Sequence, residues 1–400
     1  YAACGLQTWP EILNAAGYYT AAIGKMHFHP LRAHYGFEHM ELLHDYYRLA
    51  AKHPEWGVPM NHGLGQNEMQ PAIATVDESH SLTHWTVERS IDFLETRDST
   101  RPFFLWTSFA KPHPPFDPGR NYWELYRDID MPLPVYGDWS HSPDNVPAGF
   151  REPSWSLNNV HTFTPAMLKA VKRAYYACIT QIDYNLGLLF ARLRELELLR
   201  NTWIIFTADH GEMLGDHYLG AKSIFLEGAA HIPLLIRPPG EWDDDPRRDT
   251  VSDALDCLAD ILPTCLNLAG VSYPADRTLD GCDVLGDQPR RTTLFGHCGA
   301  FHMVIDGPYK YQYTAFGGAE LLFNLEDDPH EQHNLLTTPK GATVAKRLRA
   351  LLVAQLAEHQ DPAVKDGKLT PTHPAPTARD VHCRMWPGFH SGIVPTDVLH

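Results

Sequence analysis

The sequence predicts an α/β fold: an α/β/α sandwich with a mostly parallel central sheet, followed by a smaller C-terminal α+β region with an antiparallel sheet. Up to about residue 290, short runs of β-branched and aromatic residues alternate with amphipathic stretches. This alternation is typical of a parallel sheet covered by helices on both faces. From residue 291, short β-rich runs are separated by Gly, Asp and Pro, as in an antiparallel meander. We therefore expect three regions: 1–290, 291–345 with the antiparallel sheet, and 346–400 with a helix and an extended arm.

The first elements follow from local signals in the sequence. Thr8 and Glu11 have the spacing of a capping box, in which each side chain satisfies a backbone N–H of the other residue. This predicts the start of a helix, and Gly17 predicts its end. Residues 18–23, YYTAAI, have the composition of a short strand, and Gly24 that of the turn after it.

The middle of the chain alternates loops with regular elements. Residues 31–80 are rich in His, Gly and Asn, and we expect an irregular functional loop or lid. An amphipathic helix over 80–98 and a strand over 102–110 follow. Residues 128–160 hold many Pro, Asp, Ser and Asn, which predicts a surface loop. A long helix then begins at 164–165, Thr-Pro, with apolar residues at steps of three and four.

The remaining elements lie after residue 200. Residues 202–207 and 231–237 predict two buried strands, and 251–270 predict a helix. The last 40 residues are rich in Pro and His. We expect them to form an arm over the body or over a neighbouring subunit, which makes the arm the candidate contact of a homo-oligomer.

Composition excludes several classes of protein. The net charge of −16 argues against nucleic acid or an anionic membrane surface as a partner. No apolar run reaches the roughly 18 residues of a membrane span. The seven cysteines contain no CxxC pair, so neither a zinc knuckle nor a disulfide scaffold is indicated.

Four short clusters of reactive side chains follow predicted strands or lie near them. They are Gly24-Lys25-Met26-His27, Lys111-Pro112-His113-Pro114, Asp209-His210-Gly211-Glu212 and Ala221-Lys222-Ser223. Taken singly, each has a structural interpretation: a solvated lysine, a packed histidine or an Asx turn. Ligands bind at the carboxyl ends of strands in α/β sheets. Together these lysines and histidines would hold a tetrahedral oxyanion, and a divalent ion on Asp209 and His210 would polarise it.

This set of motifs resembles the formylglycine-dependent sulfatases of the alkaline phosphatase superfamily. The similar segments are GYYTAAIGKMH, KPHPPF, IIFTADHGEMLGDH, AKSIFLEGAAHIPLLIRPPG, DGPYKYQY and LLFNLEDDPHEQHNL. The resemblance implies an alkaline phosphatase-like fold with a catalytic sulfatase domain over 1–290. Within this family, the residues of these segments resemble most closely those of the choline sulfatase and phosphonate monoester hydrolase branch.

The resemblance also implies roles for individual residues. Lys25 and His27 would contact the nucleophile and the sulfate, and His113 and Lys222 would bind sulfate oxygens. Lys111 would help to bind the substrate, a small-molecule or saccharide sulfate ester. Asp209 and His210 would bind one divalent cation, which is Ca²⁺ by family resemblance, with Mn²⁺ or Mg²⁺ as alternatives. We leave Glu212, Asp216 and His217 outside the site, as turn, capping or supporting residues.

The family's nucleophile does not occur in this sequence. It is a formylglycine made from the Cys of a Cys-x-Pro-Ser-Arg segment, which the 400 residues lack. Cys4 lies in AACGLQT, without the Pro and Arg, so we interpret it as structural. We expect the formylglycine in an N-terminal segment that precedes a truncated chain, and the alternative is a non-catalytic pseudoenzyme.

Two further activities stay open at this point. A phosphonate monoester or phosphodiester hydrolase would use the same formylglycine and a single metal. A two-metal phosphatase or phosphoglycerate mutase would carry an Asp-x-x-x-His motif on the helix that precedes the Asp-His pair. This motif would help to bind the second metal. The corresponding residues here are Asp183 and Gly187, and a glycine cannot replace the histidine ligand. The compartment cannot be assigned from this sequence.

Overall fold

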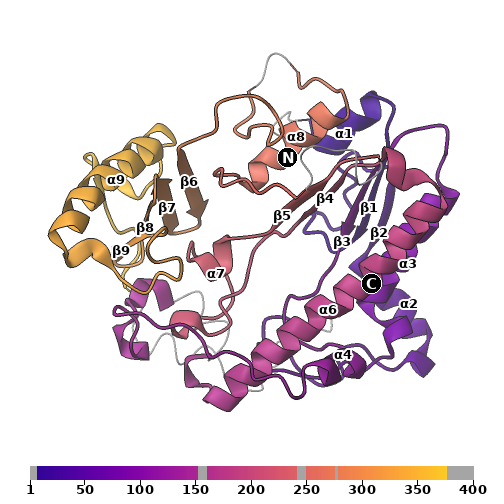
Figure 1. Ribbon diagram of the computed structural model, residues 1–400, viewed down its shortest axis with the longest axis horizontal. Coiled ribbons are helices and arrows are strands. Elements are labelled where there is room, and N and C mark those ends of the chain that lie inside the picture. The colour runs from indigo at the N-terminus through magenta and orange to yellow at the C-terminus, as the bar shows by residue number, and fades with distance from the viewer. Residues whose placement is uncertain (1–6, 152–159, 241–248, 275–277, 376–400) are drawn as a thin grey trace.

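The protein combines an α/β part with a C-terminal antiparallel sheet (Figure 1). The computed structural model describes residues 7–151, 160–240, 249–274 and 278–375. The interpretation of Cys4 and most of the expected C-terminal arm therefore lie outside the described residues. Among the described residues, no helix has the length and apolar character needed to cross a bilayer.

The central sheet of the α/β part is parallel, as predicted. It contains β1 (Tyr19–Gly24), β2 (His39–Leu42) and β3 (Phe103–Ser108) in the order β2-β1-β3. The expectation of an irregular stretch over 31–80 is wrong, because this stretch contains β2 and α2 (Leu43–Lys52). Strand β2 has four residues, two of them charged or titratable, so it gains its stability from pairing with β1 and not from an apolar run.

Helices cover both faces of the sheet. On one face, α3 (Leu82–Thr96) and α6 (Pro165–Glu195) pack on β1 and β3. On the other face, α1 (Trp9–Ala15) packs with α8 (Ile261–Leu268) around Phe104.

Local sequence signals set where these helices begin. The capping box of Thr8 and Glu11 is present at α1. Thr164 caps the long α6 by accepting from the backbone N–H of Met167, as the Thr-Pro start predicted.

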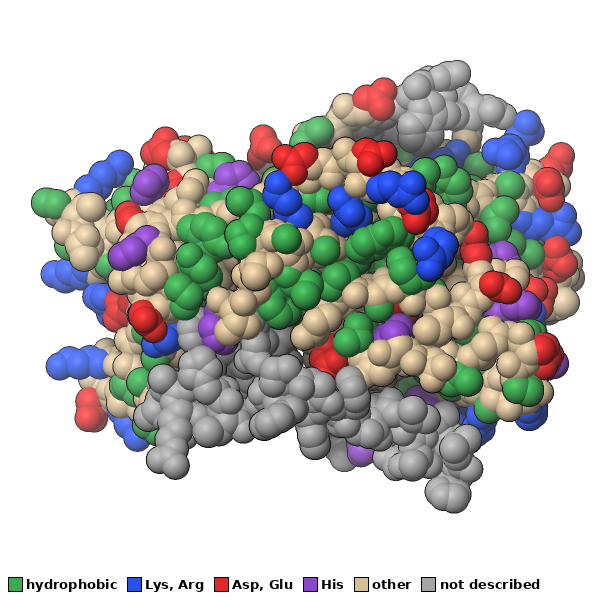
Figure 2. All heavy atoms as spheres, turned by 90° about the horizontal axis from the view of Figure 1, so that it is seen from below, with side chains coloured by type: hydrophobic (Ala, Val, Ile, Leu, Met, Phe, Trp, Pro, Cys, Tyr) green, Lys and Arg blue, Asp and Glu red, His purple; other side chains and the backbone are tan. Residues whose placement is uncertain are grey.

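Two strands pair apart from the three-stranded sheet. Strand β4 (Ile204–Thr207) is antiparallel to β5 (Leu234–Arg237). The expectation that both strands are buried is wrong, because Leu235 on β5 is 61% exposed and Phe206 on β4 is 40% exposed. Trp106 on β3 is 41% exposed. Figure 2 shows one face on which hydrophobic side chains gather in a band.

The loop expected at the surface over 128–160 has a buried centre. The short α4 (Arg120–Leu125) lies just before it, and the loop side chains Trp139, Val146 and Phe150 belong to a core cluster. The indole N–H of Trp139 donates to the carbonyl of Glu331 at 2.7 Å. This mostly polar loop therefore contains buried apolar side chains that anchor it to the core, and its composition alone did not predict them.

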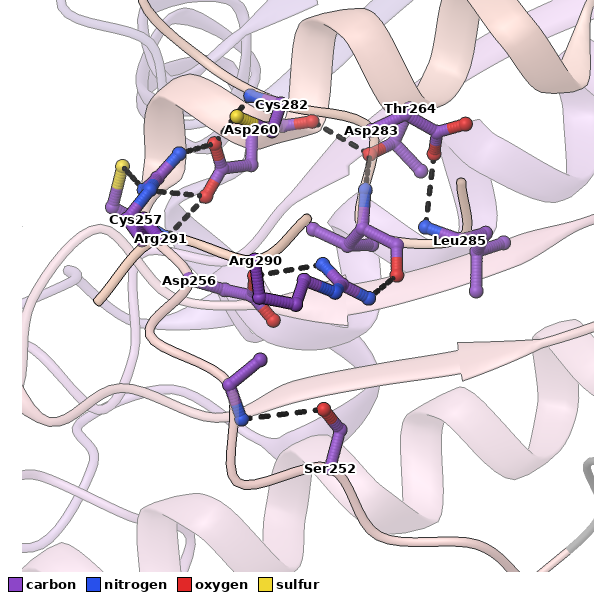
Figure 3. Close-up of polar contacts among 12 residues, drawn as sticks. Ser252, Asp256, Cys257, Asp260, Thr264, Cys282, Asp283, Leu285, Arg290 and Arg291 are labelled. Atoms are coloured by element: carbon purple, nitrogen blue, oxygen red, sulfur yellow. Dashed lines mark hydrogen bonds and ion pairs between the residues drawn. The ribbon is translucent and has the colours of Figure 1, made fainter. Parts of the chain in front are cut away.

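The helix expected over 251–270 is shorter than predicted, because a buried carboxylate lies before it. Asp260 is fully buried and accepts from the backbone N–H groups of Cys257 and Cys282 at 2.6 and 2.7 Å (Figure 3). Arg291 pairs with both of its oxygens. Burial alone would raise the pKa of Asp260, but these hydrogen bonds outweigh burial and hold the pKa below its usual value.

The C-terminal region is a meander, as predicted. Strands β6 (Thr293–Cys298), β7 (Phe301–Asp306), β8 (Tyr309–Thr314) and β9 (Glu320–Asn324) pair antiparallel in chain order. Helix α9 (Pro339–Glu358) packs on this sheet. The boundary between regions that we expected at residue 345 falls inside this helix. A small hairpin, β10 (Val364–Lys365) and β11 (Lys368–Leu369), follows.

A buried ion-pair triad joins the C-terminal sheet to the α/β part. The ammonium of Lys310 on β8 lies 2.5 Å from Glu227 Oε1 and 2.7 Å from Glu331 Oε1, and Lys310 is 1% exposed. Glu227 begins α7 (Glu227–Ala230), and its backbone N–H donates to Glu331. We call Lys310, Glu227 and Glu331 the Lys310 triad.

Replacing Lys310 with Met should destabilise the protein by about 3 to 5 kcal/mol, because two buried carboxylates lose their shared cation. Urea unfolding followed by tryptophan fluorescence measures the change, and Lys346→Met on the exposed side of α9 is the matched control. A free energy of unfolding for Lys310→Met within about 0.5 kcal/mol of the control would contradict the role given to the triad.

Candidate active site

Lys25 is placed by a close approach between the ends of two strands. Gly24 ends β1 with φ of +100°, and a Cβ there would lie 2.0 Å from the carbonyl oxygen of Ser108 on β3. The N–H of Lys25 donates to that same oxygen at 2.8 Å. Only glycine allows this contact, so the sequence Gly-Lys fixes where the lysine leaves the sheet.

Asp209 and His210 follow the end of β4 and are held by α7. A Cβ on Gly211 would lie 2.2 Å from the carbonyl oxygen of Gly228, so this backbone approach also requires glycine. The N–H groups of Gly211 and Glu212 donate to the carbonyls of Ala229 and Gly228 at 2.7 and 2.8 Å. The position of α7 therefore sets the position of this loop.

The donor atoms of Asp209 and His210 suit one divalent ion. His210 Nδ1 donates to the carbonyl of Gly211 at 2.7 Å, which leaves Nε2 with a free lone pair. That Nε2 lies 3.7 Å from Asp209 Oδ2, a separation that two ligands of one ion can adopt. Burial lowers the pKa of His210, which keeps the ring neutral, as ligation requires. The pair therefore fits a metal.

Lys222 and His113 meet although 109 residues separate them in the chain. Lys222 Nζ lies 2.7 Å from His113 Nε2, and His113 Nδ1 donates to the carbonyl of Pro114 at 2.9 Å. His113 is therefore neutral, with Nε2 accepting from the ammonium. Burial, Lys222 and Lys25 lower the pKa of His113 to about 3. The rings of His113 and His210 lie 5.9 Å apart between centroids, so Lys222 and His113 lie beside Asp209 and His210.

The carboxylates near this cluster do not fully offset the positive charge of its two lysines, Lys25 and Lys222. Burial lowers the pKa of Lys25 and of Lys222, and their nearby acids, Asp209 and Glu212, only partly offset this. Burial also raises the pKa of Glu212 to about 7, although Lys222 acts to lower it. An anion bound between Lys25, Lys222 and His113 would supply the missing negative charge.

The backbone around Lys222 is strained. Ala221 has φ of 62° and Ser223 has φ of 78°, so two residues with side chains adopt the left-handed region on either side of the lysine. Such conformations cost about 1 kcal/mol or more each and are found at functional sites. The surrounding contacts hold them, including the bond from the N–H of Met213 to the carbonyl of Ala221 at 3.1 Å.

Lys111 does not lie in this cluster, contrary to the expectation from sequence. Its ammonium pairs with Asp117 and donates to the carbonyl of Pro115 at 2.5 Å. His62 holds the other oxygen of Asp117 at 3.0 Å. The Asp117 carboxylate was not singled out from the sequence, because no local signal shows which cation it meets. We therefore assign Lys111 to shaping the loop that carries His113.

His27 is exposed, and no contact that the structure describes joins it to Lys25, His113 or Lys222. Its expected contact with sulfate therefore stays a prediction.

Two of the residues left outside the site, His217 and Asp216, have structural partners. His217 is buried against Trp139 and lies 2.8 Å from Ser140 Oγ, and Asp216 accepts from the N–H of Val135 at 2.9 Å. Their loop anchors the 128–160 segment.

Comparison with solved structures gives the fold of this protein. It superposes on phosphonate monoester hydrolase of Agrobacterium radiobacter with a TM-score of 0.72 at 23% identity, covering 91% of this chain and 84% of that one. BT4656, solved in complex with its substrate D-glucosamine-2-N,6-O-disulfate, gives a TM-score of 0.69 at 20% identity and coverages of 89% and 83%. The fold is thus alkaline phosphatase-like, as predicted.

Sequence comparison gives the family. The family model described as Sulfatase matches residues 4–271. An arylsulfatase of Clostridium perfringens is 31% identical over 402 residues, covering 92% of this chain and 82% of the relative. A choline-sulfatase of Rhizobium meliloti is 30% identical, with coverages of 84% and 68%. The chain belongs to the sulfatase family, which consists of hydrolases that act on sulfate esters.

The affinity of the site for inorganic sulfate should rise as the pH falls from about 8 to about 5. Glu212 takes up a proton as the pH falls through its pKa of about 7, which removes a negative charge beside Lys222. A bound anion also favours protonated His113, whose pKa is about 3 without it, so binding takes up protons.

Calorimetric titration in buffers of different ionisation enthalpy measures the affinity and the proton uptake together. Glu212→Gln should remove the part of the pH dependence near neutrality and leave the part below it. Equal affinities at the two ends of the pH range would contradict the electrostatic description of the site.

Proposed function

We propose that the protein hydrolyses a sulfate monoester of a small molecule or saccharide, using one divalent cation and a formylglycine nucleophile. The meeting of Lys222 and His113, with Lys25 close by, beside Asp209 and His210 is the observation that carries this proposal. The saccharide class has support from BT4656, whose structure holds a sulfated glucosamine substrate.

The lysines bind and orient the sulfate. In the proposed complex, Lys25 and Lys222 donate charge-assisted hydrogen bonds to its oxygens, which strengthen as the S–O bond to the leaving alcohol breaks. Because burial lowers the pKa of both lysines, the anion gains more from them than from lysines in water.

His113 handles a proton at Nε2. In the structure this nitrogen accepts from Lys222, and the other ring nitrogen, Nδ1, donates to the carbonyl of Pro114. When Lys222 turns to the sulfate, Nε2 is free to hold a proton for the leaving alkoxide, as a general acid does.

Asp209 and His210 would hold the cation, which supplies Lewis-acid polarisation of a sulfate oxygen. We propose Ca²⁺, with Mn²⁺ or Mg²⁺ as alternatives; the imidazole ligand suits Mn²⁺ better than it suits Ca²⁺. The formylglycine would provide the attacking oxygen from a segment outside these 400 residues, because Cys-x-Pro-Ser-Arg is absent from them.

A phosphonate monoester or phosphodiester hydrolase is the second candidate. Such substrates share the single charge and tetrahedral shape of a sulfate monoester, so the same lysines would hold them. A two-metal phosphatase is disfavoured, because Asp183 lies exposed on α6 and the residue four positions after it is Gly187 instead of a histidine. A pseudoenzyme remains the alternative if no nucleophile joins the site.

In protein that includes its nucleophile segment, Lys222→Ala should lower turnover of an aryl sulfate by about a hundredfold or more, since a transition-state contact is lost. Hydrolysis of 4-nitrophenyl sulfate measures this, and Lys346→Ala on α9 is the control. Phosphate monoesters should react more slowly than the sulfate, because their second charge lacks a second metal.

The 400-residue chain alone should bind sulfate without hydrolysing any sulfate ester. An unchanged rate for Lys222→Ala, or sulfatase activity from the 400 residues alone, would overturn the proposal.

A further inference from the structure

Two histidines and an aspartate lie together in the C-terminal region, on other elements than those of the active site. His297 on β6 pairs directly across from His302 on β7, and Asp361 follows α9. Their nearest ligand atoms all lie within 4.8 Å of one another. This is the one group of three or more potential metal ligands found in the described part of the chain.

The separations between the ligand atoms match those around a single ion. His297 Nδ1 lies 3.2 Å from His302 Nδ1 and 3.5 Å from Asp361 Oδ2. Two ligands that are each about 2.0 to 2.1 Å from a tetrahedral ion lie about 3.4 Å apart. We propose that His297, His302 and Asp361 form a metal site for Zn²⁺ or a similar transition ion, with solvent as the fourth ligand.

Hydrogen bonds alone satisfy this arrangement poorly. A ring nitrogen carries either one proton or one lone pair. His297 Nδ1 faces both an imidazole nitrogen and a carboxylate oxygen, and it can donate its proton to only one of them. An ion at the centre accepts a lone pair from all three atoms at once.

The surroundings hold the ligands ready. His302 is 1% exposed, and its ring stacks on Tyr313 with centroids 6.0 Å apart. Burial lowers the pKa of His302, so the ring is neutral near pH 7. Asp361 Oδ1 accepts from the N–H of Ala363 at 2.8 Å, which leaves Oδ2 for the ion. Supporting bonds of this kind orient ligands in metal sites.

The chemistry of the ligands selects the ion. Two imidazoles and one carboxylate suit Zn²⁺, Ni²⁺ or Cu²⁺, whereas Ca²⁺ and Mg²⁺ prefer oxygen ligands. The side chain of His297 is 56% exposed and provides the path of entry. Cys298 points to the opposite face of β6, because side chains alternate along a strand, so it is not a ligand. A bound ion would tie the end of α9 to the β6–β7 hairpin.

Zinc titration of the protein saturated with Ca²⁺ tests this proposal. The wild type should bind one Zn²⁺ per chain, and Co²⁺ at the same site should give the visible absorption of a tetrahedral complex. His297→Ala and Asp361→Asn should weaken binding by about a hundredfold or more, since each removes a direct ligand. His297 is exposed, so its loss should not unfold the protein.

Two controls separate this site from others. His333→Ala removes an exposed histidine that pairs with Asp138 and belongs to no group of three potential ligands in the described part of the chain, and it should bind Zn²⁺ as the wild type does. His210→Asn should also leave this Zn²⁺ in place.

Zinc should raise the melting temperature of the wild type and of both controls, but not of His297→Ala. Absence of Zn²⁺ binding, or binding that His297→Ala and Asp361→Asn leave unchanged, would overturn the proposal.

Discussion

The Lys310 triad is the interaction on which the candidate active site depends. A lysine buried in the C-terminal sheet is stable there only if carboxylates neutralise it, and Glu227 and Glu331 do so. Because Glu227 begins α7, the triad fixes that helix, and the carbonyls of α7 bind the backbone of Gly211 and Glu212. The C-terminal sheet is therefore part of the structure that positions Asp209 and His210.

The candidate active site gathers positive charge, whereas the whole molecule carries a net negative charge. The chain carries a net charge of −16, yet Lys25 and Lys222 lie together, and burial lowers their pKa values. Two cations that repel each other in a partly buried site are stabilised when an anion binds between them. The strained backbone on both sides of Lys222 indicates that folding energy holds this arrangement before any substrate binds.

Site residues could be predicted from the sequence where they lie in short motifs next to predicted strands. Motifs after predicted strands led us to expect that His113, Lys222, Asp209 and His210 would meet. His113 contacts Lys222 and lies beside His210, although β4 pairs apart from the sheet of β1 and β3. Contacts set by tertiary pairing were not predictable in this way. The partner of Lys111 and the antiparallel pairing of β4 with β5 are examples. The strand β2 was missed because its stability comes from β1 and not from its own residues.

The central claim is that one ion and one sulfate occupy neighbouring positions at this edge of the sheet. Crystals soaked with Mn²⁺ and sulfate, measured by anomalous diffraction, test it most directly. The account predicts a manganese peak bound by Asp209 and by Nε2 of His210, with sulfate between Lys25, His113 and Lys222. Manganese or sulfate bound only elsewhere, with Lys222 still on His113, would contradict it.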